Sequence, residues 1–477
     1  MSAPTYDAII IGSGAGGAAT ALPLVRAGRR VLMLERGEFL PRDGSTLDVH
    51  RVVERGAFLA GEPWRDADGR RFEPQEHYNV GGKTKWYGAA LFRFDPREFA
   101  ADPSYGCPAW PISLADLEPY YAEAESLLGV REFRAEPGLE WIIGRLRRSS
   151  PAWQAAPMPM GLSSDIAFHP EEAAHFDGFA SVRGLKGEVE SRFLPLLRQW
   201  EQFELLSGVE ASALLGDPRE PRRVRGVQTN DGRQWWAREV VLAAGALHSP
   251  RLLERYLAQS GLAAGLPVSA AVGRNLKMHV LTAMVTFSSR PMDDLLRKTL
   301  VLTHPDHPHS SVQPLGFDAE LIATLIPRWV PRFAARALAR RAYGFFLQTE
   351  DSSAAENRVF ERGDGGGLER VMDYRLSRLT AAAREHRSFT KTLSRSFWRA
   401  GLPSVSRRMD LSGTAHACGT LAAGTDPRRS VVDAQGRVHG LEGLYVADGS
   451  VLTRISRVNP ALTIYAWGLR LGAHLAR

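Results

Sequence analysis

The sequence predicts a mixed α/β fold built from two domains, the first of which is discontinuous. Three observations support this prediction: an apolar run that leads directly into a glycine-rich turn near the N-terminus, a similar run near residue 240, and alternating strand-like segments after residue 280. An ordinary domain holds about 100 to 200 residues, and this chain has 477. It is therefore long enough for more than one hydrophobic core.

The composition is that of an ordinary globular protein, with 44% hydrophobic and 24% charged residues. The net charge of +7 is spread along the chain, which does not indicate a nucleic-acid-binding protein. Only two cysteines are present, which excludes a disulfide framework and a cysteine-based zinc site and fits a reducing compartment. We expect neither an export signal nor a membrane span, and therefore a cytoplasmic protein.

The N-terminal region predicts a βαβ unit. Apolar residues 8–11 are typical of a buried parallel strand, and the sequence GSGAGG follows at residues 12–17. A helix is expected over 18–27 and a second strand over 30–34, which ends at Glu35. A GxGxxG motif alone is weak evidence, but in this context it predicts a dinucleotide-binding site.

Each glycine of this motif has a distinct expected task. Gly12 permits the tight turn, Gly14 lets the backbone approach a pyrophosphate, and Gly17 allows close helix packing. Glu35 can accept hydrogen bonds from an adenosine ribose and would repel a 2′-phosphate, which favours FAD or NAD over NADP.

Further elements follow along the chain. Ser113 is expected to cap a helix over 113–128, and a buried strand near 240–246 indicates a return to the nucleotide-binding sheet. Strands are expected over 283–287, 299–303, 343–349 and 443–447, and a last helix begins near Asn459. We therefore assign residues 1–280 to the first domain, with inserted loops and helices over about 100–206, residues 281–405 to the second domain, and residues 406–477 to a return to the first.

Eight motifs, in matching order and spacing, resemble those of the glucose-methanol-choline (GMC) flavoprotein oxidoreductases. They are GSGAGG at 12–17 with Glu35, GGKT at 81–84, AAGA at 243–246 followed by Ser249-Pro250, VGRNL at 272–276, HACGT at 416–420, SVVD at 430–433, YVADGS at 445–450 and NPALT at 459–463. The resemblance implies FAD bound by a discontinuous Rossmann-type domain, and a smaller substrate domain built on a mainly antiparallel sheet. It also implies oxidation of a primary or secondary alcohol, with hydride transfer to flavin N5.

The resemblance assigns roles to individual residues. By motif match, His416 takes the position of the catalytic histidine, which acts as the general base, and Asn459 takes that of its His or Asn partner. Asp448 and Gly449 would meet the ribityl and diphosphate part of the flavin. The expected FAD-binding residues are Gly12, Gly14, Gly17, Glu35, Gly81, Gly82, Thr84, Ala244, Gly245, Asp448, Gly449, Pro460 and Thr463. No metal is expected.

The chain departs from the family pattern at Tyr87, where many members place an asparagine near the flavin. Members that attach FAD covalently often use a histidine in this stretch, which here has none, and we therefore expect FAD to be held non-covalently. The expected substrate pocket contains Tyr87, Phe346 and Gln348. Side chains alternate along a strand, and the sequence does not decide whether Phe346 with Gln348 or Phe345 with Leu347 faces the pocket.

Other functions stay open at this point. A FAD-retaining lyase of the hydroxynitrile type and a catalytically silent flavin-binding protein are alternatives. The substrate could be a sugar, a polyol or a hydrophobic alcohol, and the electron acceptor oxygen, a quinone or a carrier protein.

Two surface features complete the sequence-based predictions. Arg332, Arg336 and Arg340 form a basic helix face that, with Trp329 and Phe333, could contact an anionic membrane or an acidic partner, although a solvated lid helix is the simpler interpretation. His304, His307 and His309 match no metal-binding spacing, and a solvated loop is expected there.

Overall fold

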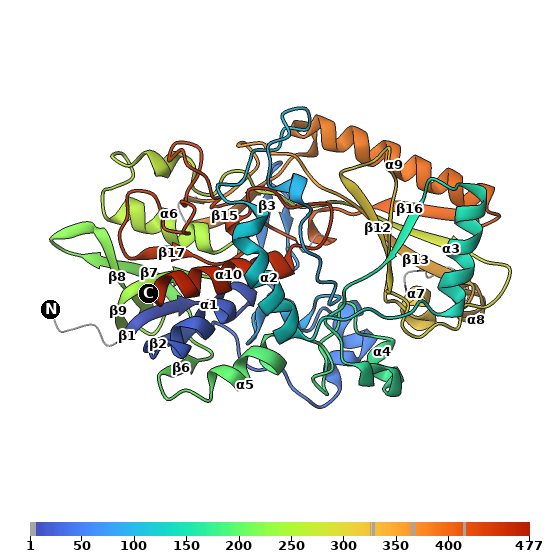
Figure 1. Ribbon diagram of the computed structural model, residues 1–477, viewed down its shortest axis with the longest axis horizontal. Helices are drawn as coiled ribbons and strands as arrows, with labels where there is room; N and C mark the ends of the chain where they lie inside the picture. Colours follow the sequence, from blue (N-terminus) through green and yellow to red (C-terminus); the bar gives the residue numbers. More distant parts are fainter. Residues whose placement is uncertain (1–5, 325, 327–329, 364–367, 414–415) are drawn as a thin grey trace.

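The computed structural model describes residues 6–324, 326, 330–363, 368–413 and 416–477. The molecule is elongated, and strand β1 (Tyr6–Ile11) and the C-terminus lie toward the same end of it (Figure 1). Three sheets organise the fold, one at each end and a smaller one between. The predicted mixed α/β fold is confirmed.

The first sheet is built around three parallel strands, β1 (Tyr6–Ile11), β2 (Val31–Leu34) and β9 (Gln234–Leu242). β1 pairs in parallel with β2 and β9, and this register places Ile9 beside Leu32 and Val240. The predicted βαβ unit is therefore present, and the C-terminal strand β17 joins the same sheet through β9. Strands of this sheet are β6 (Phe203–Leu206), β2 (Val31–Leu34), β1 (Tyr6–Ile11), β9 (Gln234–Leu242), β8 (Glu220–Thr229), β7 (Ala211–Asp217) and β17 (Leu444–Val446).

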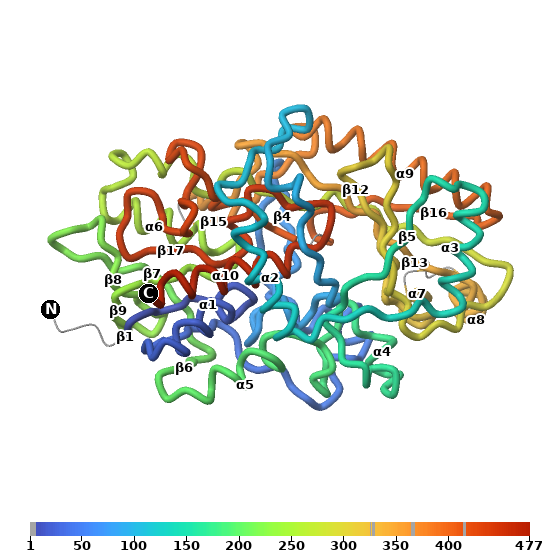
Figure 2. The backbone as a smooth tube through the Cα atoms, viewed as in Figure 1, coloured from blue at the N-terminus to red at the C-terminus, as the bar shows by residue number. Residues whose placement is uncertain are grey.

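Two helices from opposite ends of the chain pack together on this sheet. α1 (Ala15–Arg26) lies beside α10 (Ala461–Leu475), and Figure 2 shows the blue N-terminal and red C-terminal segments next to each other. Gly468 lies at their crossing, where an added Cβ would stand only 2.6 Å from the Gly16 carbonyl oxygen. α2 (Leu114–Leu128) packs on α10, and Ser113 caps it in a capping box with Asp116, as predicted.

The second sheet is antiparallel throughout, as expected for a substrate domain. One of its faces is covered by α9 (Thr380–Arg399) and α3 (Pro137–Ser149), and Phe345 and Leu347 are buried against Phe397 there. Its strands, in order, are β16 (Ser404–Arg408), β10 (Val280–Phe287), β13 (Ala342–Thr349), β12 (Ser310–Pro314), β11 (Leu300–Thr303) and β5 (Gln154–Pro157).

Chain segments cross the expected domain boundaries. β5 lies in the region 100–206 that was assigned to the first domain, yet it pairs with β11 of the second sheet. In the third sheet, β3 (Trp64–Asp66) and β4 (Arg71–Phe72) join β15 (Leu368–Asp373) and β14 (Arg358–Gly363), which come from the expected second domain. The boundaries at 280 and 405 stay a prediction, and each domain borrows strands from beyond them.

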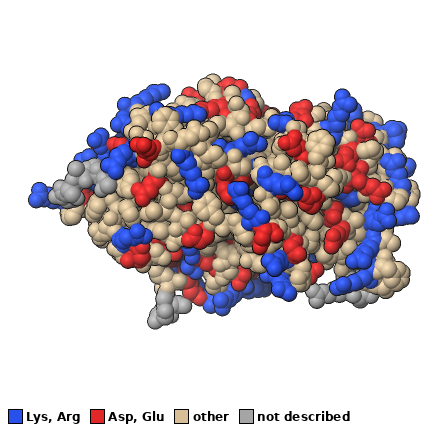
Figure 3. Space-filling view, turned by 90° about the horizontal axis from the view of Figure 1, so that it is seen from below, with Lys and Arg blue, Asp and Glu red and all other residues tan. Residues whose placement is uncertain are grey.

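The predicted basic face lies on α8 (Arg332–Ala339), next to the short α7 (Ala319–Thr324). Arg332, Arg336 and Arg340 are exposed, and so is 79% of Phe333. Seen from below, Lys and Arg side chains gather at the end of the molecule that carries α8 (Figure 3). Trp329 lies outside the described residues. Within them, every helix is too short or too polar to cross a membrane.

Candidate active site

The glycine-rich turn after β1 forms an open cradle. Gly12 has a φ of +108°, and an added Cβ would lie 2.3 Å from the Ala243 carbonyl oxygen, so a side chain cannot be accommodated. At Gly14, by contrast, an added Cβ would meet nothing within 4 Å. α1 begins there with no capping side chain and no acidic residue in its first turn. Its N–H groups are therefore available to a diphosphate.

Glu35 ends β2 beside this turn, with 7% of its surface exposed. Its carboxylate accepts hydrogen bonds from the Ser13 amide (3.0 Å), the Ser13 hydroxyl (2.5 Å) and the Gly37 amide (2.9 Å). Burial raises the pKa of Glu35, and these hydrogen bonds oppose the change. Glu35 thus stands at the strand end where a ribose hydroxyl acceptor is expected.

The segment 81–87 closes the cradle from the opposite side. The Gly81 amide donates to the Ser13 hydroxyl (2.9 Å), and the Thr84 hydroxyl donates back to the Gly81 carbonyl (2.6 Å). An added Cβ on Gly82 would stand 3.5 Å from the Gly14 Cα. The two glycine turns therefore lie against each other, as two walls of one dinucleotide site would.

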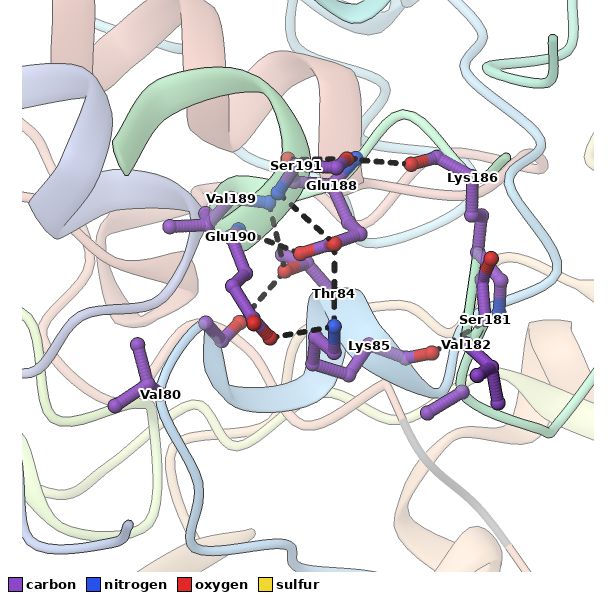
Figure 4. Close-up of polar contacts among 12 residues, drawn as sticks. Val80, Thr84, Lys85, Ser181, Val182, Lys186, Glu188, Val189, Glu190 and Ser191 are labelled. Atoms are coloured by element: carbon purple, nitrogen blue, oxygen red, sulfur yellow. Dashed lines mark hydrogen bonds and ion pairs between the residues drawn. The ribbon is translucent and has the colours of Figure 1, made fainter. Parts of the chain in front are cut away.

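A group of charged residues behind the 81–87 segment holds it in place. We call this group the Lys186 network, and it consists of Lys85, Lys186, Glu188 and Glu190. The Lys85 ammonium lies 2.7 Å from a Glu190 oxygen and 3.2 Å from a Glu188 oxygen (Figure 4). The Lys186 ammonium donates to the carbonyls of Lys85 (3.0 Å), Tyr87 (2.8 Å) and Phe179 (2.5 Å). Burial lowers the pKa of Lys186 to about 7, while three carbonyl acceptors match the three protons of its ammonium form.

A third turn follows β9. The Ala244 amide donates to the Ser249 hydroxyl (3.1 Å), and the Gly245 amide donates to Asp448 (2.9 Å). Asp448 also accepts from the Ser249 hydroxyl (2.5 Å) and precedes the turn that begins at Gly449. The residues predicted from distant motifs therefore meet, and Asp448 braces the turns of β9 and β17.

The predicted catalytic histidine is part of a chain of hydrogen bonds. Nδ1 of His416 lies 2.9 Å from Nδ1 of His279, and Nε2 of His279 lies 2.9 Å from the Ser456 carbonyl oxygen. The pKa of His416 lies well below its usual value because the surrounding protein encloses the ring and because His279, Lys83 and Lys298 lie near it. His416 is therefore neutral near pH 7.

Residues 456–459 form a short connection, the 456–459 segment, that leads into α10. Glu98 holds its start by accepting from the Ser456 hydroxyl (2.8 Å) and the Arg457 amide (3.1 Å). The Ser311 hydroxyl (2.6 Å) and the Gln348 amide (2.7 Å) both donate to the Arg457 carbonyl. The segment is thus fixed by residues from distant parts of the chain.

The same segment carries Asn459. Nε2 of Gln313, on β12, donates to Oδ1 of Asn459 at 2.6 Å. α10 starts just after Pro460 with no capping side chain and no acidic residue in its first turn, and Thr463 hydrogen-bonds with Tyr121 (2.7 Å). Asn459 and His416, 43 positions apart, are therefore linked through His279 and Ser456 at the start of an uncapped helix.

One face of β13 is turned toward this segment. Phe346 and Gln348 lie opposite Gln313 and Ser311 on β12, and paired residues point to the same side of a sheet. Phe345 and Leu347 are in the core, so Phe346 and Gln348 form the face turned toward the 456–459 segment, and that they line a substrate pocket stays a prediction. Tyr87 is half-buried, and its hydroxyl donates to the Gly187 carbonyl.

Two lysines near His416 were not predicted. Lys298 pairs with Asp177 at 3.0 Å, and Lys83 pairs with Glu76. His279 carried a weak signal, since it follows the VGRNL motif by two residues; Gln313 and Glu98 carried none.

The expectation of a solvated histidine loop is wrong. His304 and His307 are buried, and His309 bridges Asp102 (3.2 Å) and Glu350 (3.1 Å) while stacking on Tyr105. Glu350 also binds Arg454 (2.8 Å), which ties the second sheet to the C-terminal region. Over the described part of the chain, groups of three or more potential ligands placed to hold a metal ion are absent.

Comparison with family models matches residues 7–351 to FAD dependent oxidoreductases and residues 371–468 to the GMC oxidoreductase C-terminal model. The 6'''-hydroxyparomomycin C oxidase of Streptomyces lividus is 31% identical over 99% of this chain and 92% of its own length. The paromamine 6'-oxidase of Streptomyces fradiae is 28% identical over 98% and 90%. A long-chain-alcohol oxidase of Arabidopsis thaliana is 24% identical over 98% and 68%.

Solved structures show the same fold. Pyridoxine 4-oxidase from Mesorbium loti superposes with a TM-score of 0.69 at 17% identity, covering 98% of this chain and 99% of that one. A formate oxidase variant from Aspergillus oryzae gives a TM-score of 0.71 at 17% identity, covering 100% and 98%.

Proposed function

This chain belongs to the GMC oxidoreductases and uses FAD, and from that premise we propose that it oxidises a primary or secondary alcohol to a carbonyl compound. Bound FAD supplies the hydride acceptor, its N5 atom. His416 removes the hydroxyl proton and Asn459 holds the oxygen. The observation that carries this proposal is a neutral imidazole linked through His279 and Ser456 to an amide at the start of α10.

A base is needed because an alkoxide releases hydride far more readily than an alcohol does. His416 suits this task since its lowered pKa keeps the ring neutral, and able to accept a proton, at physiological pH. The amide of Asn459 can orient the same hydroxyl without titrating. The uncapped N-terminus of α10 would stabilise negative charge that develops beside it.

The glycine turns fit the rest of the cofactor. The open backbone at Gly14 would take the diphosphate, and Glu35 the adenosine ribose. We propose non-covalent attachment because the 81–87 segment has no histidine. Acid precipitation tests this: the yellow colour should stay in the supernatant, and colour that stays with the precipitated polypeptide contradicts it.

For the substrate we propose a neutral polyol or sugar-like alcohol. Two relatives are named as oxidases of 6'''-hydroxyparomomycin C and paromamine, and a third as a long-chain-alcohol oxidase. Lys83 and Lys298 act on His416 as positive charges, although each is paired with a carboxylate, so an ammonium group on a carbon next to the reacting one would be disfavoured. An amine elsewhere on the substrate would have to point away from these lysines.

The direct experiment is anaerobic mixing of the holoenzyme with a panel of sugars, polyols and long-chain alcohols. At least one alcohol should bleach the flavin absorbance. Repeating the assay with oxygen, a quinone and an artificial electron acceptor then identifies the acceptor class. If no alcohol bleaches the flavin, the lyase or silent-flavin alternative takes precedence.

A further inference from the structure

We propose that His279 and Gln313 are positioning residues that fix the hydrogen-bond polarity of the pair that faces the substrate. His279 makes Nε2 of His416 an acceptor, and Gln313 makes the free Nδ2 of Asn459 a donor. This inference rests on the proposed function. It goes beyond it because neither residue touches the reacting atoms, and both act through a neighbour.

The argument for His279 starts at the Ser456 carbonyl. A carbonyl oxygen can only accept, so the His279 Nε2 atom that lies 2.9 Å from it carries a proton. A neutral imidazole has one N–H, so Nδ1 of His279 bears a lone pair; burial lowers its pKa to about 4, which keeps it neutral. Nδ1 of His416, 2.9 Å away, must then be the donor. The remaining nitrogen of His416 therefore has a free lone pair.

The backbone at Ser456 is held in place for this contact. Ser456 is fully buried and has a φ of +68°, a conformation that costs free energy for a residue other than glycine. Glu98 accepts from its hydroxyl and from the next amide, which compensates for that cost. The Ser456 carbonyl oxygen thus has a defined direction, and the Nε2–H group of His279 donates to it.

Gln313 does the corresponding work at Asn459. Its Nε2 atom donates to Oδ1 of Asn459 at 2.6 Å, which leaves the side-chain nitrogen Nδ2 of Asn459 to donate to a substrate. β12 lies between β11 and β13, which restricts the movement of Gln313. The pair then offers one acceptor and one donor. A neutral hydroxyl satisfies both, whereas a ketone or ether cannot donate and an ammonium cannot accept.

Three charged groups lie near these rings and are kept unchanged in the test: Glu350 near His279, and Lys83 and Lys298 near His416. The test compares His279→Asn with His279→Gln in the holoenzyme. Oδ1 of Asn stands where Nδ1 of histidine was and can accept from His416, whereas the amide of Gln reaches only the Nε2 position. His279→Asn should keep flavin reduction within about tenfold of the wild type, and His279→Gln should lose about 10- to 100-fold.

The pH dependence separates positioning from packing. Both variants remove the His279 ring, which lowers the pKa of His416, but only His279→Asn keeps an acceptor that stabilises the His416 imidazolium. The acid limb of flavin reduction should therefore lie at lower pH in His279→Gln than in His279→Asn. Equal rates and equal limbs in the two variants, or a faster His279→Gln, would overturn the assignment for His279. FAD content and the unfolding temperature are measured for both.

At Gln313 the contrast is Gln313→Glu with Gln313→Met. A carboxylate would accept from Nδ2 of Asn459 and turn Oδ1 toward the substrate, which presents two acceptors to a hydroxyl. Gln313→Glu should therefore raise KM and lower kcat more than Gln313→Met does. The reverse order contradicts the role of Gln313.

A readout without turnover completes the test. In histidine-¹⁵N-labelled holoenzyme, His416 should resonate as the Nδ1–H tautomer and His279 as the Nε2–H tautomer. An Nε2–H tautomer for His416 would overturn the inference. If the wild-type flavin is not reduced by any alcohol while these tautomers are found, the proposed function fails and the positioning assignment stands.

Discussion

The Lys186 network and the 456–459 segment use hydrogen bonds in opposite ways. Behind the 81–87 segment, two lysines and a glutamate are buried and a second glutamate is half-buried, and the lysines donate hydrogen bonds to backbone carbonyls and to the glutamates. Around the 456–459 segment, two imidazoles, three side-chain amides, two hydroxyls and backbone carbonyls make most of the hydrogen bonds, with Glu98 at its start.

The difference follows from what each region has to do. Charge-assisted hydrogen bonds are strong, and breaking one inside a protein is costly, so they suit a backbone that must not move. Neutral donors and acceptors allow a proton to be received without a large electrostatic barrier. The fold therefore places the Lys186 network behind the proposed flavin wall and gives the proposed proton acceptor, His416, a neutral hydrogen-bond partner in His279. The ammonium groups of Lys83 and Lys298 act on His416 without a hydrogen bond to it.

The largest expected effect on the rate of flavin reduction comes from removing His416, the proposed base. His416→Ala should slow flavin reduction by an alcohol by roughly 10² to 10⁴-fold, because general-base catalysis is worth about that much. FAD should be retained, since the glycine turns are untouched. Stopped-flow reduction under anaerobic conditions measures the rate, and a wild-type rate would contradict the role of His416.

Removing the charge of Lys186 from the Lys186 network should lower the free energy of unfolding without changing the pH dependence of flavin reduction. Lys186→Met leaves three buried carbonyls without their donor and should lower the free energy of unfolding by roughly 3 kcal/mol. Denaturant unfolding checks this, with Lys391→Met on the surface of α9 as the matched control. A shifted pH profile of flavin reduction with unchanged stability would contradict the structural role proposed for the Lys186 network.

Lys83 tests whether a charge in the 81–87 segment changes the pKa of His416. Its ammonium lowers the pKa of His416, so Lys83→Met should raise that pKa. Because only neutral His416 accepts a proton, the acid limb of flavin reduction should move to higher pH. Lys83→Arg keeps the charge and should leave the limb in place. Identical profiles for Met and Arg would show that Lys83 does not act on His416 through its charge.

The smallest effect is expected at α8, where charge faces water. Exposed Arg332, Arg336 and Arg340 beside Phe333 should give weak sedimentation with anionic vesicles, each arginine contributing about 1 kcal/mol at the membrane surface. Neutral vesicles and the Arg336→Glu variant are the controls. Equal absence from both vesicle pellets would remove the membrane hypothesis and leave a solvated helix.

Local patterns predicted the fold well because their causes are local. The strand, glycine turn and second strand around Gly12 lie within thirty positions, and the structure confirms that unit. Alternation also predicted strands of a separate sheet, and the family resemblance implied that this sheet is mainly antiparallel. β5 was not assigned to that sheet, since its pairing with β11 is made across more than 140 positions and leaves no local signal.

The candidate site shows the same limit. Motifs led to His416 and Asn459, whose roles stay predictions. Gln313 and Glu98 belong to no motif, and their hydrogen bonds to Asn459 and Ser456 form only in the folded chain. His309 was wrongly placed in a solvated loop because a Pro-containing stretch suggested exposure, whereas its partners Asp102 and Glu350 come from far along the chain.

The contact between α1 and α10 sets an order of events during synthesis. The ribosome makes α10 after every other described element, yet α10 packs on the first helix, where Gly468 meets the Gly16 backbone, and β17 completes the sheet begun by β1. Contacts between such distant positions form slowly and only once both partners exist. The cradle for the cofactor is therefore finished last, and a nascent chain released early would carry the glycine turn without the helix that supports it.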